Sequence, residues 1–165
     1  AKKVLAPKSL TTQCGTPGYV APEILEGVAY DLKADMWSVG VILYILLGGY
    51  PPFIENNQRE LFRKIKRGDY EFHEEYWGTV STEAKNLISS LLTVKPDDRL
   101  TASAALRNPW IEYSGKDLEN KDLGINLSEF RKFNAKRKFK AAVSTVIAVN
   151  KLQNLGQEFL KNVNE

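Results

Sequence analysis

Asp35-Met36-Trp37-Ser38-Val39-Gly40-Val41-Ile42-Leu43-Tyr44-Ile45-Leu46-Leu47 is the stretch that decides the fold of this 165-residue chain. It is apolar nearly all round, which predicts a helix buried on every side and not along one stripe only. We expect Asp35 to cap its start, because a carboxylate accepts hydrogen bonds from free backbone N–H groups. Gly48-Gly49 and then Pro51-Pro52 should end it. The apolar part is shorter than the roughly 20 residues that cross a bilayer, so this helix belongs at the centre of a globular helical domain.

Helical signals flank this stretch. Asn, Ser and Thr stand where helices would begin, because their side chains accept hydrogen bonds from the free N–H groups of a first turn. No alternating strand pattern of useful length is found, and residues 70–78 are aromatic and irregular, so we expect a mainly α chain. The expected helices run from Pro22 to Gly27, from Asn57 with Glu60 (a capping box) to Gly68, from Ser81 to Pro96, and from Thr101 to Pro109.

Composition narrows the class of protein. The net charge of +3 is too small to indicate a nucleic-acid binder by itself, and no nucleic-acid partner is expected. Cys14 is the only cysteine, which excludes an internal disulfide, gives no metal cluster and fits a reducing compartment. Neither a signal-peptide pattern nor a membrane span is recognisable. We therefore expect a cytoplasmic protein, with the nucleus as a second location.

The last part of the chain has a different character. Residues 112–126 are polar and predict a linker, whereas residues 127–165 mix basic and apolar side chains and predict a basic amphipathic helix. Phe139, Val146 and Leu152 are expected on one side of that helix, with Val143 between them. The basic block consists of Arg131, Lys132, Lys136, Arg137, Lys138 and Lys140.

Three motifs, in order, resemble the C-terminal lobe of a eukaryotic protein kinase, over about residues 1 to 111. Residues 14–23, Cys-Gly-Thr-Pro-Gly-Tyr-Val-Ala-Pro-Glu, are similar to the end of an activation segment of the serine/threonine class. Residues 35–40, Asp-Met-Trp-Ser-Val-Gly, are similar to the start of the central helix of that lobe. Residues 98–101, Asp-Arg-Leu-Thr, with 107–110, Arg-Asn-Pro-Trp, are similar to the last block of the domain. Within the family, Gly49-Tyr50-Pro51-Pro52-Phe53 and residues 133–140 resemble calmodulin-dependent kinases.

The resemblance implies roles in the activation segment. Thr12 stands where an upstream activating kinase phosphorylates many members, and a phosphate there would order the loop against basic groups. The Thr16 hydroxyl would help to hold the catalytic Asp. Protein substrates would rest on a platform made of Gly15, Thr16, Pro17, Gly18 and Tyr19.

Further roles are implied in the body of the lobe. Glu23 and Arg99 would form a bidentate ion pair that fastens the activation segment. Asp35 would reach the backbone of the catalytic loop, and Glu55 would contact a basic residue of the substrate. Without the resemblance, Glu23 and Arg99 could equally be an exposed pair that contributes about 0–1 kcal/mol.

Several parts of a kinase are not found in this sequence. Phosphoryl transfer needs a glycine-rich loop, a strand Lys, a His-Arg-Asp catalytic loop and an Asp-Phe-Gly magnesium site, and His73, the single histidine, is not followed by Arg-Asp. The resemblance therefore implies ATP and Mg²⁺ as cofactors of an intact kinase, and a piece that binds neither and is inactive alone.

The tail resembles an autoinhibitory and calmodulin-binding segment. The resemblance implies calcium-loaded calmodulin as the partner, bound through Lys136, Arg137, Lys138, Phe139, Lys140, Val143, Val146 and Leu152. Asn126 occupies the region where some relatives carry a regulatory Thr. Two alternatives remain. The tail could serve autoinhibitory packing or bind an anionic membrane instead of calmodulin. The protein could also be a truncated or pseudokinase interaction module instead of an enzyme. The expected organisation is a lobe over 1–111, a linker over 112–126 and a regulatory tail over 127–165.

Overall fold

The computed structural model describes residues 16–112 and 124–163, with the side chains of the last helix described as far as Leu152. The described residues form helices and no β-strand. Two compact units divide the chain, Ala1–Phe130 and Arg131–Glu165. The helices are η1 (Pro17–Tyr19), α1 (Pro22–Leu25), α2 (Lys33–Gly48), α3 (Gln58–Arg67), α4 (Glu74–Trp77), α5 (Thr82–Leu91), α6 (Ala102–Leu106), α7 (Pro109–Glu112) and α8 (Gly124–Val163).

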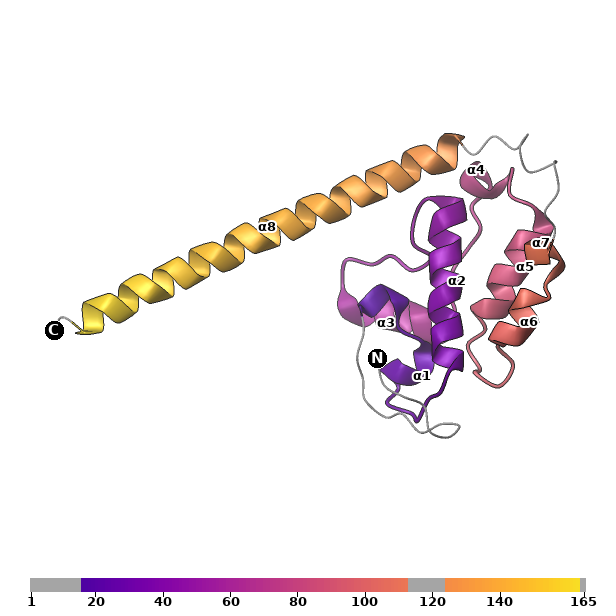
Figure 1. The fold of residues 1–165 in the computed structure, drawn as a ribbon, viewed down its shortest axis with the longest axis horizontal. Coiled ribbons are helices and arrows are strands. Elements are labelled where there is room, and N and C mark those ends of the chain that lie inside the picture. The colour runs from indigo at the N-terminus through magenta and orange to yellow at the C-terminus, as the bar shows by residue number, and fades with distance from the viewer. Residues whose placement is uncertain (1–15, 113–123, 164–165) are drawn as a thin grey trace. The chain divides into compact units, whose positions relative to one another are not determined.

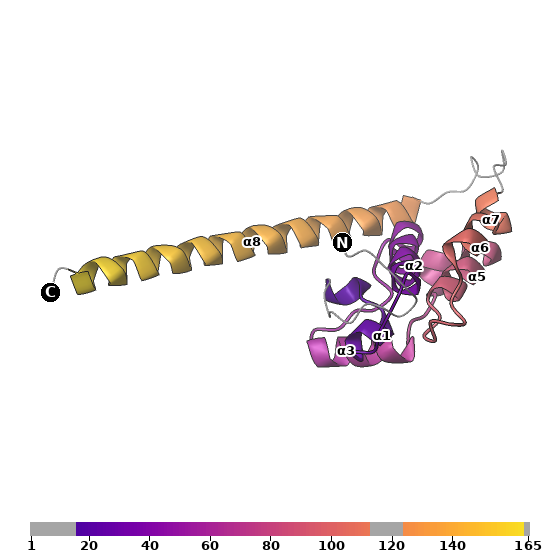
Figure 2. The same ribbon diagram turned by 60° about the horizontal axis from the view of Figure 1, so that its bottom comes forward.

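Helix α2 is the axis of the first unit. Both ribbon views place it between α1 and α3 on one side and α5, α6 and α7 on the other (Figures 1 and 2). Its buried face carries Trp37, Val41 and Tyr44, each at most 1% exposed. Fully burying a large apolar side chain contributes about 1.5–3 kcal/mol, so this face stabilises the lobe by several kcal/mol.

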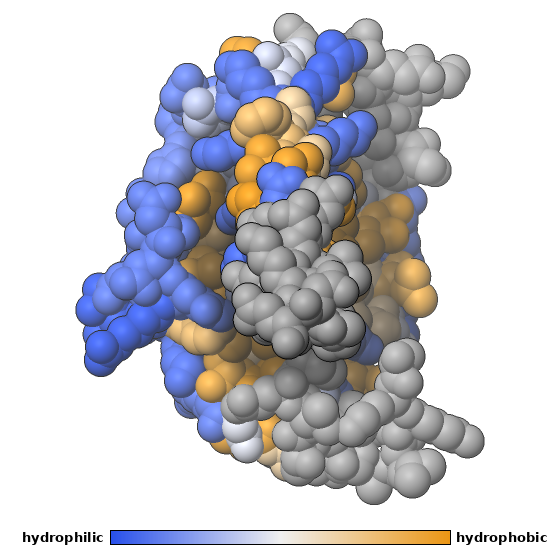
Figure 3. Space-filling view, turned by 90° about the vertical axis from the view of Figure 1, so that its left-hand side faces the viewer, coloured by the Kyte–Doolittle hydropathy of each residue, from blue (hydrophilic) through white to orange (hydrophobic). Residues whose placement is uncertain are grey.

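The opposite face of α2 is open, so the expectation that the helix is buried on every side is wrong for this chain. Val39, Ile42 and Leu46 are 45%, 47% and 57% exposed. They recur every three or four residues and therefore form one stripe. An all-apolar sequence shows that every face tolerates burial, but the neighbours present decide which faces are covered. Hydrophobic residues are likewise seen at the surface between hydrophilic ones in Figure 3.

The start of α2 corrects a second expectation. The helix begins at Lys33, so Asp35 lies inside the first turn and does not cap it. The carboxylate of Asp31 instead accepts a hydrogen bond from the backbone N–H of Lys33 at 2.9 Å. Asp35 still suits its place, because a negative charge in the first turn is stabilised by the positive end of the helix dipole. The expected end is confirmed by Gly49, whose φ of +85° suits glycine.

Most other helix boundaries follow their expected caps. The side chains of Asn57, Ser81 and Thr101 accept backbone N–H bonds at the starts of α3, α5 and α6. The capping box is only half formed, because Glu60 pairs with Arg63 one turn further on and not with the start of the helix. Helix α4 lies inside the segment expected to be irregular, and α8 begins at Gly124, inside the segment expected to be a linker.

Candidate functional site

The structure brings Glu23 of α1 and Arg99 together. The Nη1 and Nη2 groups of Arg99 donate to the two carboxylate oxygens of Glu23 at 2.7 and 2.9 Å. Both residues are buried, with Arg99 1% and Glu23 6% exposed. The pair joins positions 76 apart in the sequence, so it ties the segment that follows η1 to the far end of the lobe.

Arg99 uses all five of its N–H donors. Besides the two bonds to Glu23, its Nε donates to the carbonyl of Thr93 at 2.9 Å, Nη1 to that of Lys33 at 2.7 Å and Nη2 to that of Val94 at 3.1 Å. The guanidinium also lies over the Trp37 ring, 5.2 Å from its centroid. A buried charge is tolerated only when its hydrogen-bonding capacity is satisfied, and here it is satisfied completely.

The segment expected to form a substrate platform is described from Thr16 onward. Residues Pro17–Tyr19 form the short helix η1, and the Tyr19 N–H donates to the Thr16 carbonyl at 2.9 Å. The hydroxyl of Ser38 on α2 donates to the Tyr19 carbonyl at 2.8 Å. The segment is thus tied to the central helix by a residue that sequence reasoning did not single out, although Ser38 stands inside the recognised motif. Thr12 and Gly15 lie outside the described residues.

Two further candidate residues are at the surface. The Asp35 side chain is exposed in the first turn of α2. The Glu55 carboxylate lies 2.8 Å from the Lys64 ammonium of α3. The hydrogen bond that the Lys64 ammonium donates to Glu55 raises the pKa of Lys64. A basic substrate residue would therefore have to compete with Lys64 for Glu55.

An aromatic cluster surrounds Tyr44 in the C-terminal half of α2, and the sequence did not lead us to expect it. Tyr44 packs against Tyr50, Tyr70, Phe72 and Trp77, with ring centroids 4.6–6.0 Å apart. The Tyr44 hydroxyl donates to the Glu71 carbonyl at 2.5 Å, and the Trp77 indole N–H donates to the Tyr50 oxygen at 3.1 Å. Burial raises the pKa of Tyr44 far above its usual range. The density of aromatic residues in 70–77 was the available signal.

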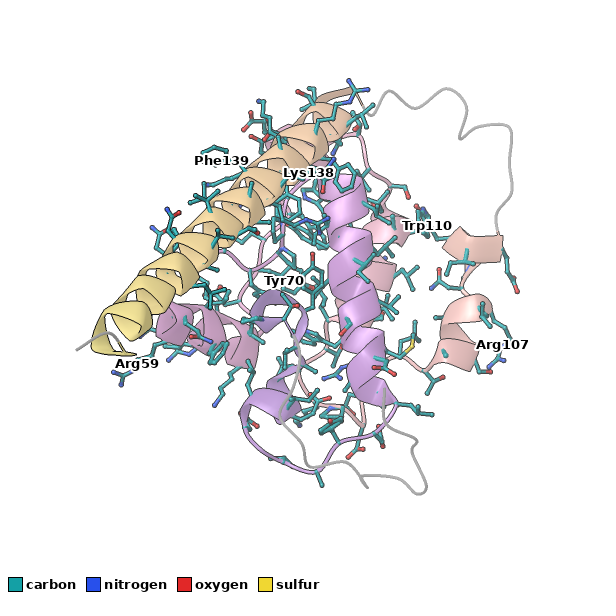
Figure 4. The ribbon with its side chains drawn as sticks, turned by 60° about the vertical axis from the view of Figure 1, so that its left-hand side comes forward. Arg59, Tyr70, Arg107, Trp110, Lys138 and Phe139 are labelled. Carbon is teal, nitrogen blue, oxygen red and sulfur yellow. The ribbon has the colours of Figure 1, made fainter. Side chains whose placement is uncertain are left out.

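Helix α8 carries the candidate partner-binding residues. Phe139, Val143 and Val146 are 72%, 39% and 58% exposed, and their spacing of four and three places them on one side of the helix. Phe139 and Lys138 project from different sides of α8 in Figure 4. Leu152 is 69% exposed, but it follows Phe139 by thirteen positions, or about 3.6 turns, and so points to the other side. The expectation that all four share one side is wrong for Leu152. The basic residues Lys136, Arg137, Lys138 and Lys140 are exposed.

Other kinds of site find little support in the part of the chain that is described. No group of three or more His, Cys, Asp or Glu side chains among those residues could hold a metal ion. Within the same ranges, no helix is both long and apolar enough to cross a membrane.

Known proteins resemble this chain. Residues 1–111 match the family described as protein kinase domain. The chain is also 43% identical over 147 residues to calcium/calmodulin-dependent protein kinase type II subunit delta of Oryctolagus cuniculus. That match covers 89% of this chain and 28% of the relative, so the chain spans less than a third of the relative's length. The helical unit around α2 is the C-terminal lobe of a kinase fold, and the chain belongs to the protein kinase family.

Proposed function

We propose that this chain is the C-terminal lobe and regulatory tail of a serine/threonine kinase of the calmodulin-dependent type. The whole protein would transfer the γ-phosphate of ATP to Ser or Thr side chains of protein substrates. The observation that supports this most is the buried Glu23–Arg99 pair, because it holds the segment that follows Thr16 in a fixed place on the lobe. Phosphoryl transfer depends on such positioning, since little covalent chemistry is done by the protein itself.

The chain by itself would be inactive. ATP and Mg²⁺ would serve the intact kinase. What this chain would supply is the surface that receives the substrate, at Gly15 to Tyr19, and the scaffold beneath it. We further propose that Thr12 is phosphorylated by an upstream kinase and that the protein works in the cytoplasm, with the nucleus as a second location.

A pair of threonine variants tests the kinase proposal on the parent protein. Thr16→Ala should lower the rate of phosphate transfer from labelled ATP, because the hydroxyl would hold the catalytic Asp, while the unfolding temperature stays the same. Thr82→Ala is the control, because Thr82 is equally an exposed threonine at the start of a helix. Equal rates for the two variants would contradict the role of Thr16, and a parent protein without any transfer activity would favour the interaction module.

The tail would bind calcium-loaded calmodulin. Its exposed side chains combine positive charge with bulky apolar groups, which are the two features of helices that such a partner recognises. Phe139, Val143 and Val146 would fill the groove of one calmodulin lobe, and Leu152 on the other side would meet the second lobe. Phosphate on Ser144 or Thr145 would oppose binding through its charge and desolvation cost.

Titration of the full chain with calmodulin, in calcium and in EGTA, tests this half of the proposal. Phe139→Ala should weaken calcium-dependent binding at least about tenfold, equivalent to about 1.4 kcal/mol. Leu106→Ala is the matched control, because Leu106 on α6 is 69% exposed, close to the 72% of Phe139. If the chain binds phosphatidylserine vesicles but shows no calcium-dependent binding to calmodulin, the calmodulin proposal is contradicted and an anionic membrane is the partner of the tail.

A further inference from the structure

Asn126, in the first turn of α8, has a buried side-chain amide. It is only 4% exposed. Its Nδ2 donates to the Leu47 carbonyl at 2.6 Å and to the Tyr76 carbonyl at 2.5 Å. A carboxamide nitrogen carries two hydrogens, so both are used, one toward each carbonyl. All three residues belong to the unit Ala1–Phe130.

The two carbonyls that Asn126 reaches lie at helix ends. Leu47 is in the last turn of α2, and Tyr76 is in the last turn of α4. The last four carbonyls of a helix have no partner within the helix, so a donor from outside is needed. One amide from α8 thus meets two such needs at once and joins α2, α4 and α8.

Gly49 makes room for the same contact from the other side. Its φ is +85°, and a Cβ added there would lie 2.5 Å from the Asn126 carbonyl oxygen and 2.8 Å from the Glu129 Cβ. It would also lie 3.0 Å from the Phe130 backbone nitrogen. The first turns of α8 therefore rest directly on the backbone that ends α2, and only glycine permits so close an approach.

We propose that Asn126 is a latch that fixes the root of α8, residues Gly124–Phe130, to the end of α2. Beyond Phe130 the helix belongs to a separate unit. The latch therefore lies at the boundary between an anchored root and a tail that is available to a binding partner. The carboxamide is required by the geometry, because two carbonyl oxygens need two donors. A carboxylate at this position could donate to neither, and it would also face the negative end of the α2 dipole.

Hydrogen exchange on the full chain tests the latch. The first backbone N–H groups of a helix have no carbonyl of an earlier turn to bond, so the amides of residues 128–130 are the reporters. In Asn126→Asp, which keeps the shape of the side chain, these amides should exchange at least about tenfold faster, while those of α5 keep their rates. Asn150→Asp is the matched control, because Asn150 is exposed on the same helix. In this variant the root of α8 should exchange at the same rate as in the unmodified chain.

Two results would overturn the proposal. Unchanged exchange at residues 128–130 in Asn126→Asp would show that the amide does not hold the root. Equal acceleration of the root and of α5 would show that Asn126 is an ordinary core residue of the lobe. Gly49→Ala provides an independent variant, because it displaces the root without changing Asn126, and it should reproduce the local acceleration.

The latch also bears on capture of the tail, a consequence that rests on the proposed function. If calmodulin competes with the lobe for α8, then Asn126→Asp should bind calcium-loaded calmodulin several-fold more tightly, because release of the root no longer opposes binding. Faster exchange at the root without any calmodulin binding would refute the calmodulin proposal and leave the latch intact. Faster exchange at the root with unchanged calmodulin affinity would show that the latch only stabilises the fold and would refute its effect on calmodulin binding.

Discussion

Replacing Arg99 with methionine should destabilise the lobe by about 3–5 kcal/mol, because breaking a buried ion pair leaves one charge without compensation. The Arg99 side chain is fully buried and that of Glu23 is 6% exposed. Methionine fills much of the same volume but offers no donor. The Glu23 carboxylate would then remain buried without the two bonds of 2.7 and 2.9 Å that it now accepts.

The magnitude follows mainly from the charge. Arg99→Met also leaves the carbonyls of Lys33, Thr93 and Val94 without the donor that each has now. An unsatisfied buried carbonyl costs about 1–3 kcal/mol, but these three bonds are only partly buried, so water can replace the lost donor. The total still amounts to a large share of the 5–15 kcal/mol that is usual for a whole domain.

Urea unfolding followed by tryptophan fluorescence measures this loss. Trp37 is a suitable reporter, since it is completely buried and its ring lies 5.2 Å from the guanidinium. Arg63→Met is the control: Arg63 pairs with Glu60 on the surface, with side chains 61% and 39% exposed, and should cost at most about 1 kcal/mol. A loss for Arg99→Met as small as that for Arg63→Met would refute the reasoning.

Two further predictions concern packing and pH. Gly40→Ala should lower the free energy of unfolding in urea by about 1–3 kcal/mol, because the added Cβ would lie 2.8 Å from the Leu91 Cβ. The control is Gly18→Ala, where nothing lies within 4 Å of the added Cβ, and its effect should stay within about 0.5 kcal/mol. Equal losses for the two variants would contradict the close packing of α2 on α5. Burial raises the pKa of Tyr44 and of Tyr70 above the usual value. When the pKa of a tyrosine is higher in the folded than in the unfolded state, the resulting stabilisation of the fold is fully present below about pH 10. It is lost as the pH rises beyond that value. The free energy of unfolding should therefore fall above about pH 10, and Tyr44→Phe should flatten that fall; parallel curves for the two proteins would contradict the assignment to Tyr44.

Local features of the fold could be predicted because they depend on neighbours in the sequence. Asn57, Ser81 and Thr101 cap helices through bonds that span two or three residues, so the sequence contains both partners of each bond. Gly49 and Gly68 end helices with positive φ, a conformation that side chains disfavour. The family was equally readable, because its motifs are short and their order is visible.

The candidate site was only partly predictable. Resemblance named Glu23 and Arg99 as a pair, but the three carbonyls that complete the shell of Arg99 come from backbone whose position no residue type reveals. Leu152 was misplaced because an apolar residue was assumed to join the nearest apolar side, whereas a continuous helix fixes its direction by residue count.

What the sequence alone determined here is therefore the helical class, the caps of α3, α5 and α6, the family and the basic helix at the end of the chain, since each depends on residue types within a few positions. The tertiary structure alone decided which side of α2 lies against neighbours and which remains exposed at Val39, Ile42 and Leu46. It also decided that Asn126, in an expected linker, is buried against Leu47 and Tyr76. These outcomes depend on which distant segments meet, because burial and hydrogen-bond satisfaction are properties of contacts and not of residues taken singly.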